Sequence, residues 1–281
     1  MDVTLITAVL LAALLHAGWN ALVKISGDSF LTFFLFKVGA LPFAVVLLLF
    51  TGVPDAAALP YLIASGLTLL AYALFLGHAY QNADFSIVYP IARGVAPVGV
   101  AVLAMVFADE RLSGPMLAGT GVVSLGIMLL AFQRRPQRAM LSGMLSAAGV
   151  GATIATYTLL DGIGARLSGD PIAYMALLNI ASFAPICAVA LVRRRSEAMA
   201  LVAKEWRRGL IGGTLMYLAY GIVIYALAMA PMASVSALRE TSVIIAAIIG
   251  TRLMKEPFGL RRVIAATMVF AGVAIIILAR N

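Results

Sequence analysis

The sequence has little of what a soluble enzyme needs. It contains one cysteine, Cys187, two histidines, His16 and His78, and only 11% charged residues. A single cysteine excludes an intrachain disulfide, and two histidines in different apolar segments do not form a metal site. Soluble domains carry about 25% charged residues, so the low charge excludes a water-soluble protein. Since no phosphate-binding loop, paired metal ligands or catalytic triad is present either, we expect no enzyme, no cofactor and no bound metal.

What the sequence has instead is apolar blocks, because 63% of its residues are hydrophobic. About 20 apolar residues in a helix cross a ~30 Å hydrocarbon core, and a backbone in lipid must satisfy its own hydrogen bonds. The sequence therefore predicts an all-α integral membrane protein with ten transmembrane helices and the lipid bilayer as its surroundings. The expected segments are 3–23, 30–51, 59–80, 85–107, 113–132, 139–160, 171–192, 208–229, 233–253 and 260–279.

The net charge of +8 would suggest a nucleic-acid partner in a soluble protein, but here the cations lie in the connections between apolar segments. Connections after the odd-numbered segments hold 14 Lys and Arg, and the opposite side holds 3. By the positive-inside rule both termini are expected outside the cytoplasm. The first apolar run has no basic region before it, so it reads as a retained span. We expect a multi-pass protein of the plasma membrane, in bacteria the inner membrane, with no nucleic-acid partner.

A weak internal repeat relates the two halves of the chain. At an offset of 146 residues the matching pairs are Arg93 and Arg239, Ala101 and Ala247, Glu110 and Glu256, Val123 and Val269, Gly126 and Gly272, and Arg134 and Arg280. The tripeptide 26–28, Ser-Gly-Asp, also recurs at 168–170. Two repeats of five spans, 1–135 and 136–281, must insert in opposite orientations because five is odd. Inverted repeats of this kind are typical of alternating-access transporters.

The endings of the two halves carry a family resemblance. The first half has Pro97, then Glu110-Arg111-Leu112-Ser113, Gly119 and Gly126, and the second has Glu256-Pro257-Phe258 and Gly272. With the five-plus-five repeat, the chain resembles the ten-span EamA-type members of the drug/metabolite transporter (DMT) superfamily. The resemblance implies a secondary transporter and favours export. Val243 stands where the first half has Pro97, so we expect a weaker helix distortion in the ninth segment than in the fourth.

Charged residues inside the apolar segments are the first candidates for a substrate site. Arg93 and Arg239 lie within the fourth and ninth segments, and Glu240 follows Arg239 directly. A charge near the bilayer midplane is costly and usually faces a cavity or a partner. Arg93 is therefore expected either to line a cavity or to form a structural ion pair with Glu240. Lys37, in the second segment, either extends to the membrane surface or reaches the cavity.

Aromatic and polar residues complete the candidate site. His16, Trp19 and Asn20 share one face of the first segment by their spacing, and His78 lies in the third. A buried phenol needs a partner or water, so we assign the deeper tyrosines to the cavity: Tyr72, Tyr89, Tyr157 and Tyr220. The alternative is an aromatic belt at the membrane surfaces. Tyrosines near segment ends are assigned to that belt: Tyr61, Tyr80 and Tyr174.

These features together predict a transporter of a small polar or amphipathic metabolite. Interior cations favour a substrate with a carboxylate, phosphate or phosphonate group, such as an amino acid. The alternatives are an intramembrane enzyme acting on a lipid-linked substrate and a non-catalytic subunit of a membrane complex. Small residues such as Gly119, Gly126 and Gly272 permit close helix packing. They fit a monomer packed on itself or a homodimer interface.

Overall fold

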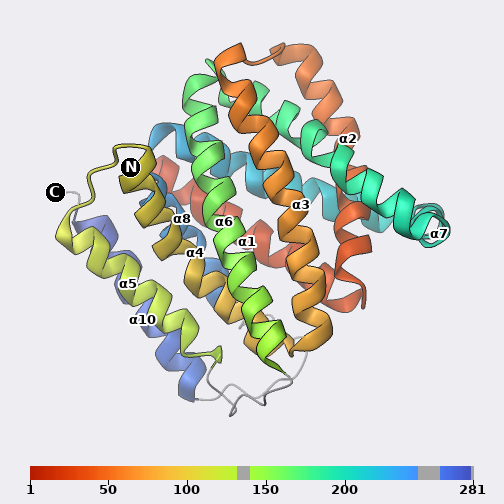
Figure 1. Ribbon diagram of the computed structural model, residues 1–281. Coiled ribbons are helices and arrows are strands. Elements are labelled where there is room, and N and C mark those ends of the chain that lie inside the picture. The colour runs from red at the N-terminus through yellow and green to blue at the C-terminus, as the bar shows by residue number, and fades with distance from the viewer. Residues whose placement is uncertain (132–139, 246–259, 280–281) are drawn as a thin grey trace.

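The structure is a computed structural model that describes residues 1–131, 140–245 and 260–279. Helices form a bundle in which no strand occurs over the described ranges (Figure 1). They are α1 (Val3–Ile25), α2 (Ser29–Thr51), the short 3-10 helix η1 (Ala56–Ala58), α3 (Leu59–Asn82), α4 (Phe85–Phe107), α5 (Gly114–Met128), α6 (Leu141–Leu167), α7 (Pro171–Met229), α8 (Met232–Arg239) and α10 (Leu260–Leu278). Within these described ranges, six helical stretches are long and apolar enough to cross a membrane. The all-helical, membrane-spanning fold class is confirmed.

Part of the repeat evidence lies outside the described residues. This holds for Ala247 and Glu256, for the ending 256–258, and for Arg134 and Arg280.

The repeated Ser-Gly-Asp tripeptide forms the same local structure twice. Gly27 and Gly169 both have positive φ, 78° and 70°, a conformation that glycine adopts without steric cost. Each is followed by an aspartate that caps the next helix. Asp28 accepts a hydrogen bond from the backbone N–H of Leu31 at 2.9 Å, and Asp170 accepts one from that of Ile172 at 2.8 Å. The tripeptide is thus a turn-and-cap unit at the start of α2 and of α7.

Helix α7 contains two of the predicted segments. Its 59 residues would extend about 90 Å at 1.5 Å per residue, about three times the hydrocarbon thickness. Arg194 and Glu205 have non-helical φ/ψ angles and mark breaks between the two parts. We call residues 171–193 the first arm and 206–229 the second arm. At the break, the Arg194 guanidinium pairs with Asp28 and Glu197.

The ninth segment departs from the sequence expectation. Val243 in place of a proline predicted a weaker distortion than in α4, and this was wrong. Helix α4 continues through Pro90 and Pro97, whereas α8 ends at Arg239 and Glu240 forms a turn. The Val243 N–H donates to the Glu240 carbonyl at 2.9 Å, an i to i+3 bond that tightens the turn. The interruption therefore does not depend on proline, and it falls at the two interior charged residues.

Glycines allow three close contacts between helices. A Cβ added to Gly39 of α2 would lie 2.8 Å from the Leu210 amide nitrogen, and one on Gly213 would lie 2.7 Å from that of Ala40. In α5, a Cβ on Gly119 would lie 2.8 Å from the Gly272 carbonyl oxygen of α10. The small residues of α5 and α10 thus pack against each other within one chain.

Hydrogen bonds and ion pairs join the connections between helices at each end of the bundle. At one end, the Glu110 carboxylate accepts from Arg166 Nη2 at 2.6 Å and from the Met232 N–H at 2.9 and 3.0 Å. Nearby, the Asp55 N–H donates to the Ser168 carbonyl at 3.0 Å. The Asp28–Arg194 pair links the connections at the other end. Connections that are expected on the same membrane side are therefore in contact.

Candidate functional site

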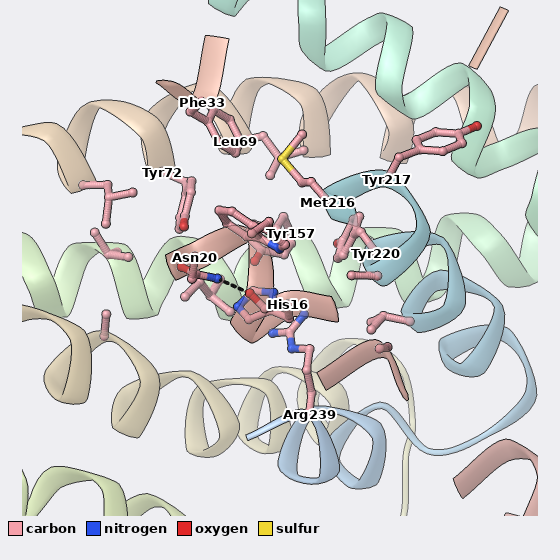
Figure 2. A pocket seen from close by; sticks show the side chains of 18 of the residues that line it. His16, Asn20, Phe33, Leu69, Tyr72, Tyr157, Met216, Tyr217, Tyr220 and Arg239 are labelled. Atoms are coloured by element: carbon pink, nitrogen blue, oxygen red, sulfur yellow. Dashed lines mark hydrogen bonds between the residues drawn. The ribbon is translucent and has the colours of Figure 1, made fainter. Parts of the chain in front are cut away.

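A central cavity of about 90 Å³ lies between α1, α2, α3, α4, α6, both arms of α7, and α8 (Figure 2). One water needs about 10–15 Å³ of such space, so the cavity can hold several waters or a small solute. Ten of the twelve predicted site residues line it: His16, Trp19, Asn20, Lys37, Tyr72, Tyr89, Arg93, Tyr157, Tyr220 and Arg239. The wall thus draws on both halves of the chain. The substrate-binding role of these residues stays a prediction.

Arg93 satisfies both alternatives that the sequence left open. Its Nε lies 2.8 Å from Glu240 Oε2, and the two side chains are 4% and 0% exposed. Its Nη2 donates to Ser242 Oγ at 3.3 Å. Arg93 also lines the cavity, whereas Glu240 is not part of the wall. A buried pair of this kind costs about 3–5 kcal/mol to break by removing one partner.

Arg239 has no comparable ion pair among the residues that the structure describes. It is 2% exposed, and its Nε and Nη2 atoms make no hydrogen bond to any described residue. Figure 2 shows its guanidinium directed at the cavity, toward His16. A buried guanidinium with open donors can bind an anion, since charge-assisted hydrogen bonds to carboxylate or phosphate are strong.

Lys37 is buried inside the protein and does not reach the membrane surface. It is 7% exposed. Its Nζ donates to Asn179 Oδ1 at 3.2 Å and to Ser182 Oγ at 2.7 Å, both on the first arm of α7. The same atom lies 5.8 Å from the centroid of the Phe33 ring. Lys37 is therefore a third interior cation on the cavity wall, besides Arg93 and Arg239, and it lies on α2.

Four aromatic rings form a row along the cavity. The centroids of Phe33 and Tyr72 are 5.8 Å apart, those of Tyr72 and Tyr157 are 6.1 Å apart, and those of Tyr157 and Tyr220 are 5.7 Å apart. The last two contacts are edge-to-face, a favourable geometry for aromatic pairs. In Figure 2 Tyr157 lies between Tyr72 and Tyr220. The row provides an apolar surface with hydroxyl groups at its edge.

Three sequence assignments need correction. His78 is exposed and does not line the cavity. The cavity face of α3 carries Leu69, Tyr72, Leu76 and Tyr80, and a residue six positions after Tyr72 is rotated away from that face at 3.6 residues per turn. Tyr80 belongs to this face, so its assignment to an aromatic belt was wrong.

Tyr174 was also assigned to the belt, but it is fully buried. It packs where Gly164 of α6 leaves room for its ring.

The sequence prediction missed Asp161. Its side chain is fully buried on α6 and accepts hydrogen bonds from the hydroxyls of Tyr174, at 3.0 Å, and of Tyr220. The predicted sixth segment ended at residue 160, so Asp161 fell outside it. The helix continues to Leu167. The sequence feature that could have shown that the helix continues is the apolar sequence on both sides of Asp161.

A second cavity of about 250 Å³ adjoins the first. The two share wall residues on α1, α2 and α3: Trp19, Asn20, Phe33, Leu76 and Tyr80. The second extends to Gly27, Ser29 and Asp84, at the end of the bundle that holds the Asp28–Arg194 pair. We call it the vestibule. The site thus has an approach from one end, while the ties of Glu110 join the helices at the other.

Comparisons with known proteins agree with this arrangement. A crystal structure described only as that of a protein superposes with a TM-score of 0.77 at 18% identity, covering 99% of this chain and 96% of the other. This likeness shows a shared fold. No curated protein matches the sequence. The profile of the EamA-like transporter family matches residues 141–278, which confirms the resemblance seen in the sequence. Members of this family are membrane transporters, and the second half of this chain is identified with the EamA-like transporter family by this match.

Proposed function

We propose that this protein is a secondary transporter of a small polar or amphipathic metabolite that carries an anionic group. The observation that carries the proposal is the buried Arg239 guanidinium on the cavity wall, with donors that no described residue uses. A carboxylate, phosphate or phosphonate fits this position, and an amino acid is one such substrate. Export is the direction that the family resemblance favours.

The interior charges support an anionic substrate. Among the described residues, five charged side chains are buried: Lys37, Arg93, Asp161, Arg239 and Glu240. When all are ionised, they leave an excess of one positive charge. Interior charges in membrane proteins are costly unless they are balanced. A bound monoanion would balance this excess.

The aromatic row supports a substrate with an apolar part. Tyr72 and Tyr157 present ring faces and edges to the cavity, and Phe33 extends the row toward Lys37. An apolar group against these rings is removed from water, which is favourable in proportion to its buried area. A molecule with its anion at Arg239 and its apolar part on the rings would use both features.

The contacts between helices support ten crossings in two inverted repeats, 1–135 and 136–281. In such a repeat the contact of α3 with α6 has its counterpart in α1 with the second arm of α7. Both occur, the second at Gly18 and Leu215. Likewise α2 meets the second arm at Gly39, and α3 meets the first arm at Gly66. The α5–α10 contact is its own counterpart, as expected for a helix pair on the pseudo-two-fold axis.

Alternating access is supported by the difference between the two ends. The vestibule leads from the cavity to the connection that holds Gly27. At the opposite end, Glu110 holds α6 and the start of α8 through Arg166 and Met232. The positive-inside rule makes the vestibule end cytoplasmic. We infer a state that is accessible from the cytoplasm and closed on the other side.

Counterflow in proteoliposomes tests the proposed function. Purified protein is reconstituted in vesicles preloaded with one candidate solute, and labelled solute is supplied outside. Amino acids, organic acids and phosphonates are screened, with protein-free vesicles and the Arg239→Gln variant as controls. Accumulation of an anionic solute by the native protein alone is the expected result. Counterflow confined to cationic or uncharged solutes would contradict the anion site.

Reporter fusions test the orientation. A reporter after Asn281 and one within residues 193–208 are expected to report opposite membrane sides, the second cytoplasmic. Two cytoplasmic signals would show that the distribution of Lys and Arg is misleading for this chain.

A further inference from the structure

The buried carboxylate of Asp161 is not explained by anion binding. It lies on α6 and is fully buried, with one oxygen accepting from the Tyr174 hydroxyl and the other from the Tyr220 hydroxyl. The two donors come from the first and second arms of α7. Asp161 is not part of the cavity wall, but Tyr220 is. Tyr220 therefore connects the carboxylate to the cavity through a single hydroxyl group.

The charged and titratable groups around Asp161 are few. Lys37 of α2 acts on it electrostatically but makes no ion pair with it within 4 Å in the part of the chain that the structure describes. From α3, the Ser65 hydroxyl faces Asp161. Tyr157, on α6 itself, lies within electrostatic reach of Asp161.

The groups on α4 and α8 belong to a different cluster. Arg93 pairs with Glu240, and Arg239 acts on Glu240 electrostatically.

The surroundings of Asp161 suit a group that gains and loses a proton. Glu240 has the Arg93 guanidinium beside it, so protonating Glu240 would leave a buried cation unpaired. Asp161 is held by phenol hydroxyls, and its protonation breaks no ion pair. A neutral carboxylic acid can still accept from Tyr174 and donate its own O–H. Both protonation states of Asp161 can therefore be accommodated without a large rearrangement.

We propose that Asp161 is a proton-binding site coupled to the substrate cavity, and this rests on the proposed function. In the transfer, the Tyr220 hydroxyl gives its proton to an Asp161 oxygen and takes one from a water in the cavity. The carboxylate becomes a neutral acid, the phenol is restored, and the water leaves as hydroxide or passes on a proton that it has received. No charge or atom is left over.

Protonation of Asp161 strengthens anion binding in this arrangement. It raises the excess interior charge from one to two and releases the Tyr220 hydroxyl, which can then donate to a substrate. Linkage is reciprocal, so a bound anion also favours the bound proton. The two would move across the membrane together. A transporter of this kind releases an anionic metabolite with a proton down the metabolite's own gradient.

The proton site can be tested without a substrate. Infrared difference spectra of the purified protein between acid and alkaline pH should show the carbonyl band of a protonated carboxylic acid. The component of this band that belongs to Asp161 is expected to be lost in Asp161→Asn and shifted in Tyr220→Phe, which removes one hydrogen bond, while the other carboxyl groups keep their contribution. Asparagine keeps an acceptor for the tyrosines, and gel filtration verifies folding. An unchanged band in a folded Asp161→Asn variant would overturn the proposal.

The coupling is tested with benzenesulfonate, an anion whose charge does not change with pH. Two tryptophans are present, and Trp19 lines the cavity whereas Trp206 is 55% exposed. In a Trp206→Phe background, fluorescence therefore reports binding at Trp19. Affinity is expected to fall roughly tenfold from acid to alkaline pH, within the usual range for coupled sites. In Asp161→Asn it should stay at the acid level.

Glu197→Gln is the matched control. Glu197 is an exposed carboxylate outside the membrane segments, and the hydrogen bond from Arg194 lowers the pKa of its carboxyl. It stays ionised over the tested range, so its removal should leave the pH profile unchanged. The same pH dependence in Asp161→Asn as in the native protein would overturn the coupling. Absence of benzenesulfonate binding at every pH would contradict the anion site, while the infrared band still decides the proton site.

Discussion

Arg93 and Arg239 occupy equivalent positions at the 146-residue offset, yet their surroundings differ. Arg93 is held by Glu240 and Ser242, whereas two donor atoms of Arg239 have no described partner. Both guanidiniums are buried and both line the cavity. The source of the asymmetry is Glu240, whose equivalent in the first half is Gly94. One acidic residue thus pairs with one arginine and leaves the other with open donors, so the two equivalent arginines supply one candidate anion site and not two.

Removing Arg93 should have the largest effect on stability. Arg93→Ala leaves the Glu240 carboxylate buried without its partner, at a cost of about 3–5 kcal/mol, and transport should be lost while expression and membrane insertion persist. Thermal unfolding in detergent and proteoliposome transport measure the two effects. The double variant Arg93→Ala/Glu240→Ala should recover stability. Restored transport in the double variant would show that the pair is structural and that neither residue binds substrate.

Removing Arg239 should affect binding and leave stability nearly unchanged. Arg239→Ala removes a guanidinium whose donors are open, so no described partner loses a hydrogen bond. Loss of charge-assisted hydrogen bonds of about 1.5–3 kcal/mol should weaken anion binding about 10- to 150-fold. Benzenesulfonate titration and thermal unfolding are the measurements. A loss of stability equal to that of Arg93→Ala would remove the distinction between the two arginines.

Weakening the ion pair and hydrogen bonds of Glu110 should shift the equilibrium between the state that is open at the vestibule end and the state that is open at the opposite end. Glu110→Gln removes the charge that pairs with Arg166, whose side chain is 31% exposed. Such a pair contributes up to about 1 kcal/mol, so its loss should raise the population of the state that is open at the Glu110 end about fivefold. In a Cys187→Ser background, a cysteine placed at the buried Ala230 should react about fivefold faster with an impermeant maleimide. Glu197→Gln, at the other end, should leave the rate unchanged, and a faster rate there would indicate general loosening.

Single hydroxyl groups in the cavity should have the smallest effects. Tyr72→Phe, Tyr89→Phe, Tyr157→Phe and Tyr220→Phe keep the ring, so stability should change little where the hydroxyl faces the cavity. Where the hydroxyl holds the substrate, its loss costs roughly 0.5–1.5 kcal/mol, a few-fold in apparent affinity. The Michaelis constants for several solutes should shift unequally. Tyr61→Phe is the control, and equal shifts at Tyr61 would contradict a role of the four hydroxyls in binding.

The elements of the fold could be predicted from hydropathy because burial in a membrane leaves a strong signal in each segment. The positions of individual side chains were harder to predict, since they depend on contacts with residues that are distant in sequence. Lys37 is held by Asn179 and Ser182 across 142 and 145 residues, and nothing near Lys37 shows this. Asp161 and Tyr174 are partners on adjacent helices. Tyr174 was assigned to a segment end and Asp161 was left outside its predicted segment, and only their contact explains why both are buried.

The contact between Gly39 and the second arm of α7 has a mechanical consequence. Where two backbones touch, the helices cannot rotate or slide past each other without separating, so we expect α2 and the second arm to move as one rigid body, called the beam below. Lys37 and Tyr220 are both attached to this beam, whereas Arg239 is attached to α8. Any rocking of the beam against α8 would change the spacing between Lys37 and Arg239 and leave that between Lys37 and Tyr220 nearly constant. The contacts of a bound solute with Lys37 and Tyr220 would then stay constant during such a movement, and only its contact with Arg239 would form or break.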